Sequence, residues 1–178
     1  MGLRKAGAYS KKYARPYTRK SKVKQRSYIK TVPNSKIVKF KMGDLQGFES
    51  GKYKIVLNVH SKHDVQMRDN SIEATRQYLN RFLLERVGKD FYFEVKPYPH
   101  HILRENKMLT GAGADRMQTG MALSFGKSIG RAALVKKNQI ILTVAVLNPK
   151  HEAIARKLIN SVKARLPCTI HVDTLRAK

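Results

Sequence analysis

Acidic residues are scarce in this chain. Asp and Glu together number 12 among 178 residues, against 37 Lys and Arg, so the formal net charge is +25. Few carboxylates leave few candidates for paired acid–base catalysis, and so large a positive charge favours a polyanionic partner. Apolar residues still make up 42 % of the chain. That share can build a hydrophobic core, so we expect a folded protein.

Cysteine and long hydrophobic runs are nearly absent. The lone Cys168 excludes an internal disulfide and a metal site built from several thiolates. No apolar run approaches the ~18 residues of a transmembrane helix, and the N-terminus lacks the apolar stretch of a secretory signal. Ala6 stands where a myristoylation signal starting at Gly2 needs Ser or Thr. We therefore expect a cytoplasmic protein without membrane contact.

The charge is concentrated at the N-terminus. The first acidic residue is Asp44, and 14 basic residues precede it. Self-repulsion opposes collapse of such a segment, so residues 1–34 are predicted to be a basic extension that a nucleic-acid partner orders. Pro16 disfavours a helix there, which makes its tyrosines candidate stacking platforms for bases or riboses: Tyr9, Tyr13, Tyr17 and Tyr28. The alternative is a solvated tail with incidental tyrosines.

Residues 35–178 are predicted to form a single α+β domain. Alternating or continuous apolar runs predict strands at 36–41, 53–60, 91–96, 139–147 and 168–172. Strand, helix and strand therefore follow one another twice, at about 53–96 and 139–174. This order favours a sandwich in which two helices pack on one face of a mixed or mostly antiparallel sheet.

The two helices carry their own start and stop signals. Asn70 as N-cap with Glu73 three residues later is close to a capping box, and Gly88 is placed to end the first helix. Asn148 followed by Pro149 predicts the start of the second helix, which should run to about residue 166. Aliphatic residues recur at helical spacing in both, and we assign these faces to the core.

Residues 98–131 show neither pattern and are predicted to be a long loop. Glycines fall at 111, 113, 120, 126 and 130 among several cations, a composition that suits close backbone approach to phosphate. Nucleotide-binding motifs are not met, since Arg116 occupies the place of a third fingerprint glycine and Gly120 is one residue out of P-loop register. His60 with His63, and His100 with His101, have no partner pattern for a metal site, and no nucleophile motif occurs.

The chain resembles a known family in several motifs. Arg15-Pro16-Tyr17 and residues 26–29 and 32–37 are followed by Pro99-His100, by Ile102 to Lys107, and by Gly111-Ala-Gly-Ala-Asp-Arg116. The match continues through residues 118–121 and 125–127. In these motifs the sequence is similar to archaeal large-subunit ribosomal proteins of the L10e branch of the universal L16 family. The run 102–127 is the most specific part of the resemblance.

The resemblance implies an α/β-hammerhead fold, no enzymatic activity, no cofactor and no metal. It implies a structural component of the large subunit, a monomer within the particle, which contacts other subunit proteins and large-subunit rRNA near 5S rRNA. On this basis the predicted rRNA-binding residues are Arg4, Lys5, Lys11, Lys12, Tyr13, Arg15, Tyr17, Arg19, Lys20, Lys22, Lys24 and Arg26. A glycine-rich loop at about 104–120 is implied to point toward the tRNA acceptor end, through Arg104, Lys107, Gly111, Gly113, Asp115 and Arg116.

Two other classes stay open at this stage. A free RNA chaperone would bind many RNAs with similar affinity and would not sediment stoichiometrically with large subunits. An enzyme acting on RNA through residues 98–131 would show turnover, and the absence of an identifiable acid–base pair argues against it.

Overall fold

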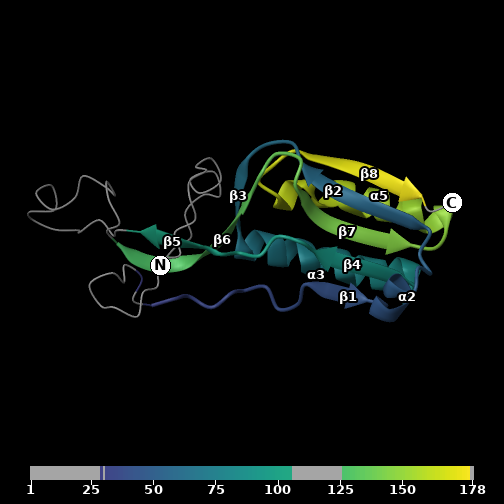
Figure 1. The fold of residues 1–178 in the computed structure, drawn as a ribbon, viewed down its shortest axis with the longest axis horizontal. Helices are drawn as coiled ribbons and strands as arrows, with labels where there is room; N and C mark the ends of the chain where they lie inside the picture. The colour runs from purple at the N-terminus through teal and green to yellow at the C-terminus, as the bar shows by residue number, and fades with distance from the viewer. Residues whose placement is uncertain (1–28, 30, 106–125, 177–178) are drawn as a thin grey trace, which may run out of the picture.

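A computed structural model describes residues 29, 31–105 and 126–176 of the chain (Figure 1). These residues form two antiparallel sheets, two long helices and short helical segments. The predicted α+β class is thereby confirmed. The predicted rRNA-binding residues all lie outside the described residues, so the division at residue 34 stays a prediction.

The larger sheet has five strands in the order β1-β4-β7-β2-β8, and every neighbouring pair is antiparallel. Its strands are β1 (Lys41–Gly43), β2 (Ile55–Ser61), β4 (Phe91–Val95), β7 (Ile140–Val146) and β8 (Ile170–Arg176). The two predicted strand–helix–strand units interlock, because β7 lies between β2 and β4 while β2 lies between β7 and β8. This is the split β-α-β arrangement, which sequence order alone does not reveal.

Two helices, α3 (Asp69–Val87) and α5 (Pro149–Val162), pack side by side against this sheet, and η2 (Lys163–Arg165) extends α5 (Figure 1). Their buried stripes meet the sheet in one core that includes Leu79, Leu83, Phe93 and Ile159. The predicted inward faces of both helices are therefore confirmed. On the opposite side of the sheet, the ring of Phe48 in α2 (Leu45–Glu49) stacks on Tyr92 at 4.0 Å.

A second sheet extends from the body, with strands in the order β3-β6-β5. They are β3 (Val65–Arg68), β5 (His101–Glu105) and β6 (Lys127–Val135). The prediction of one long loop over 98–131 is therefore wrong at both ends, where β5 and β6 form an antiparallel pair. Gly126, Lys127 and Gly130 obscure the strand pattern at the start of β6, because glycine and exposed lysine are poor strand signals.

Three local predictions also need correction. The helix α3 begins at Asp69 with Arg68 at the N-cap, and Asn70 lies inside it without a capping role. The strand expected at 36–41 is wrong except at Lys41, the first residue of β1, because the backbone N–H groups of Lys36 and Val38 donate to carboxylates of α3 instead of to a strand. The loop expected between residues 43 and 51 contains α2, whose N-cap Asp44 accepts a 2.8 Å hydrogen bond from Gly47 N.

Candidate RNA-binding surface

Of the six residues predicted for the functional loop, only Arg104 belongs to the described residues. It lies in β5 and is half-buried. Lys107, Gly111, Gly113, Asp115 and Arg116 lie outside the described part of the chain, as do the predicted rRNA-binding residues. What the structure shows is therefore the body that carries both predicted segments, and the points at which they join it.

The predicted loop joins the body through a two-stranded stem. In the antiparallel pair of β5 and β6, Glu105 lies opposite Lys127 and Arg104 lies opposite Ser128. A register shift between Leu103 and Arg104 marks a bulge, which bends the stem locally. The chain thus enters and leaves residues 106–125 at adjacent positions.

The chain that follows the N-terminal segment runs beside the same stem. Ser128 Oγ donates a 2.6 Å hydrogen bond to the carbonyl of Thr31, and Arg131 Nε donates one of 2.6 Å to the carbonyl of Pro33. Ile29 is buried. The two predicted RNA-binding segments therefore meet the body at neighbouring points on β6, through contacts that join residues 97 and 98 positions apart in sequence. Figure 1 shows the described chain before β1 running toward the end of the molecule that bears β5 and β6.

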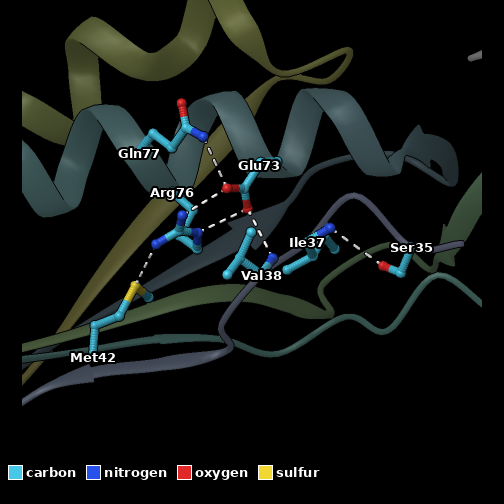
Figure 2. Close-up of polar contacts among 7 residues, drawn as sticks. All are labelled: Ser35, Ile37, Val38, Met42, Glu73, Arg76 and Gln77. Atoms are coloured by element: carbon cyan, nitrogen blue, oxygen red, sulfur yellow. Dashed lines mark hydrogen bonds and ion pairs between the residues drawn. The ribbon is translucent and has the colours of Figure 1, made fainter.

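Glu73 anchors the chain between the N-terminal segment and β1 (Figure 2). Its carboxylate accepts hydrogen bonds from Arg76 Nε and Nη2 at 2.8 and 2.6 Å, from Gln77 Nε2 at 3.0 Å and from Val38 N at 3.3 Å. The Arg76 guanidinium lowers the pKa of the Glu73 carboxyl, burial opposes this, and the bonds from Gln77 and Val38 lower it further. Arg76 Nη1 also lies 3.2 Å from Met42 Sδ. The Glu73–Arg76 ion pair therefore connects α3 both to Val38 and to Met42 in β1.

A row of rings runs from half-buried Phe40 to exposed Tyr98 and His100, beginning two residues after Val38. Phe40 stacks on Tyr98 with ring centres 5.5 Å apart, and Tyr98 lies 4.5 Å from His100. Arg131 Nη1 donates a 3.3 Å hydrogen bond to Tyr98 Oη. Sequence reasoning gave Phe40 and Tyr98 no role. The signal that could have found them is the alternation of Tyr98 and His100 with the buried prolines at 97 and 99.

Titratable groups elsewhere in the described residues are engaged structurally. His60 contacts the Asn138 carbonyl through Nδ1 at 2.9 Å and Asp173 through Nε2 at 3.2 Å. Burial, and secondarily Arg104, lowers the pKa of His101, which favours its neutral form. Burial raises the pKa of the Cys168 thiol. No group of three or more His, Cys, Asp or Glu positioned for a metal ion occurs within residues 31–105 and 126–176.

The geometry also bears on the nucleotide-binding reading. Gly126-Lys127-Ser128, which preserves only the end of a P-loop, leads into β6 rather than into a helix. A P-loop needs the N-terminus of a helix directly after it to hold phosphate, and that element is absent at this place.

In the described part of the chain, no helix is long and apolar enough to cross a membrane.

Comparison with known proteins decides the family. The model of the family described as "Ribosomal protein L16p/L10e" matches residues 13–173. The chain is 38 % identical to "Large ribosomal subunit protein uL16" of Methanococcus maripaludis over 179 aligned residues, which cover all of this chain and 97 % of that protein. The chain is also 40 % identical to the uL16 protein of Staphylothermus marinus, in an alignment that covers 94 % of this chain and 90 % of that protein. It is 39 % identical to the uL16 protein of Thermofilum pendens, in an alignment that covers 94 % of each. The chain belongs to the L16p/L10e family of ribosomal proteins.

Family membership confirms the resemblance on which the earlier expectations depend. The chain has a structural role in the ribosome, in the cytoplasm, and is not an enzyme. The reading as an RNA-processing enzyme is thereby set aside. The match begins at residue 13 and so includes part of the basic N-terminal segment as well as the loop region.

Proposed function

We propose that this chain is a structural constituent of the large ribosomal subunit, anchored on large-subunit rRNA near 5S rRNA by its N-terminal segment. The loop at about 104–120 is then presented toward the tRNA acceptor end near the peptidyl-transferase region. The observation that carries the proposal is the junction on β6, where the carbonyls of Thr31 and Pro33 bind Ser128 and Arg131 beside the stem that ends at Glu105 and Lys127. Anchor and loop therefore share one rigid support.

The physical basis of anchoring is counterion release. Each lysine or arginine that neutralises an rRNA phosphate frees a condensed cation, and affinity then falls steeply with added salt. Residues 1–28 contain ten Lys and Arg and no acidic residue. If all ten contact phosphate, they contribute about −7 to the slope of log K against log salt, at ~0.7 per contact. Sequence selectivity then comes mainly from the folded shape of the RNA.

The body supplies rigidity to this arrangement. The Glu73–Arg76 pair and the Lys36 N–H bond to Asp69 at 3.2 Å hold the extended chain along α3. A fixed exit point lowers the entropy lost when the N-terminal segment binds RNA. The chemistry of peptide transfer stays with RNA, and the protein positions and braces.

Deletion of residues 1–28 tests the anchor. We expect weaker binding to a large-subunit rRNA transcript and a salt dependence that is flatter by several units, while the thermal melting of the body is retained. The control is a full-length chain with Lys136 and Lys137 changed to Gln, which removes two exposed charges at the turn before β7. A deletion variant with an unaltered salt slope contradicts the anchoring role.

Substitution of Arg116 tests the loop. Arg116→Ala is expected to impair subunit maturation or translation while the melting temperature of the free protein is unchanged, because the residue belongs to the glycine-rich segment and not to the described core. Arg81→Ala, on the exposed surface of α3, is the matched control. Parallel losses of melting temperature and assembly would indicate a folding defect instead.

Gradient sedimentation distinguishes the proposal from the free-chaperone alternative. Quantitation should find one copy of the chain in each large subunit at low and moderate salt. A chaperone would instead be spread over lighter fractions and many RNAs. Substoichiometric recovery from intact subunits would end the proposal.

A further inference from the structure

A cavity of about 340 Å³ lies where β3, the start of α3 and η2 meet. Gln66 and Arg68 of β3, Asn70 and Ser71 of α3, and Arg165 of η2 contribute its polar lining. Leu166 and Pro167 supply an apolar wall, and the small side chains of Ala74 and Ala164 leave the space open. The cavity is separate from the row of rings and from the junction on β6.

The charged residues that line this cavity are all positive. Two arginines line it, and none of its lining residues is acidic. The neighbouring carboxylate of Asp69 is buried and accepts hydrogen bonds from the backbone N–H groups of Lys36 and Asn70, at 3.2 and 2.8 Å. The acid nearest in sequence is therefore engaged by backbone donors, and the cavity suits an anion.

Contacts within the chain hold the cavity in shape. Ser71 Oγ donates a 2.5 Å hydrogen bond to the carbonyl of Arg165 and so closes α3 onto η2. The guanidinium of Arg165 lies 4.2 Å from the centre of the Tyr78 ring, within cation–π range. An arginine fixed in this way loses little side-chain freedom on binding. Asn70 Oδ1 is buried and accepts no hydrogen bond from any described residue.

We propose that this cavity receives one unstacked nucleotide of large-subunit rRNA. The inference rests on the proposed function, since it takes rRNA as the partner. The nucleotide phosphate lies beside Arg68 and Arg165, and its base packs on Leu166 and Pro167. RNA-binding proteins commonly read unstacked bases by a combination of packing and hydrogen bonds to the base edges, and the cavity lining includes the polar residues Gln66 and Asn70. An acidic side chain of a neighbouring protein would meet the charge but would leave the apolar part of the cavity empty.

Filling the cavity without changing its charge is the first test. The probe is a large-subunit rRNA transcript bound to the full-length chain, with ribose acylation used to find protected nucleotides. Ala164→Phe should abolish the protection of one nucleotide and weaken binding about tenfold, which is the loss expected from a base that no longer packs. Ala153→Phe is the matched control, because Ala153 is also exposed, lies on α5 and does not line the cavity. It should keep both protection and affinity.

Removing the charge is the second test. Arg165→Gln should weaken binding about tenfold and should abolish ultraviolet cross-links from peptides containing residues 164–167 to RNA. Arg81→Gln removes the same charge from an arginine that also faces an aromatic ring, 5.6 Å from Phe82, outside the cavity. Its effect should stay within about twofold. Thermal melting of all four variants, compared with the parent chain, checks that they fold.

The outcomes distinguish a failure of the cavity proposal from a failure of the proposed function. If Ala164→Phe and Arg165→Gln match their controls while the parent chain binds rRNA, the cavity proposal is overturned and the proposed function stands. If the parent chain itself does not bind rRNA, the proposed function fails first. Cross-links from residues 164–167 to another subunit protein, with none to RNA, would also overturn the proposal.

Discussion

Glu73→Gln is expected to be the most damaging conservative change on α3. All four groups that contact the carboxylate are hydrogen-bond donors, namely two guanidinium nitrogens of Arg76, Gln77 Nε2 and Val38 N. Glutamine has nearly the same shape, but its –NH₂ group must face at least one of these donors. The Arg76 guanidinium, with a side chain only 11 % exposed, then loses its counter-ion.

The magnitude follows from these contacts. A hydrogen bond to a charged group contributes about 1.5–3 kcal/mol, and breaking a fully buried ion pair costs about 3–5 kcal/mol. Glutamine keeps one acceptor oxygen, so we expect a loss of about 2–3 kcal/mol in the free energy of unfolding. For a body of this size, that corresponds to a melting temperature lower by about 5–10 °C.

Thermal and urea unfolding, followed by circular dichroism, measure this loss. The pH dependence adds a second readout, because Arg76, against the opposing effect of burial, lowers the pKa of Glu73 from its ordinary value of 4.5. A lowered carboxyl pKa stabilises the fold above the unfolded value, and this contribution is lost as pH falls through the folded value. The difference between parent and variant should therefore be constant near neutrality and shrink below about pH 4.5.

Glu85→Gln is the control, since Glu85 is exposed on the same helix. It should change the free energy of unfolding by less than about 0.5 kcal/mol. If Glu73→Gln and Glu85→Gln unfold alike, the reasoning about the Glu73 ion pair is refuted. It is also refuted if the difference in stability between the parent chain and Glu73→Gln persists at pH 2.

Three further predictions concern the core, β1 and the thiol. Leu83→Ala, at a fully buried position, should cost about 2–5 kcal/mol in urea unfolding; a cost equal to that of the exposed Leu84→Ala would contradict the packing. Gly43→Ala should destabilise more than Gly51→Ala, because both have positive φ but a Cβ at 43 would lie 2.1 Å from the Phe91 carbonyl oxygen; equal melting temperatures would refute this. Cys168 should be alkylated more slowly than glutathione at pH 8, since burial raises its pKa; equal rates would show an accessible thiolate.

Local signals predicted much of the fold. Apolar spacing located both long helices and most strands of the larger sheet, and Gly88, at φ 84°, ends α3 as expected. These signals act within a few residues, so they survive in a single sequence. The predicted capping box does not form, and the reason is also local. The Glu73 carboxylate binds the guanidinium of Arg76, a charged donor that holds it more strongly than a backbone N–H does.

The candidate site was less predictable. The sequence shows the cations and glycines of the loop region, but it does not predict the stem formed by β5 and β6, where glycines and a lysine weaken the strand signal. The row of Phe40, Tyr98 and His100 joins segments about sixty residues apart. Nothing in the spacing of those residues along the chain indicates that they meet.

By itself, the sequence determined the net charge, its concentration before Asp44, the helix faces and the family motifs, because each is a property of composition or of neighbouring residues. Only the tertiary structure decided which distant groups bind each other. Arg131 reaches Pro33 across 98 residues, and Ser71 reaches Arg165 across 94. Such partners are set by how sheets and helices pack, and the cavity beside η2 exists only once that packing is complete.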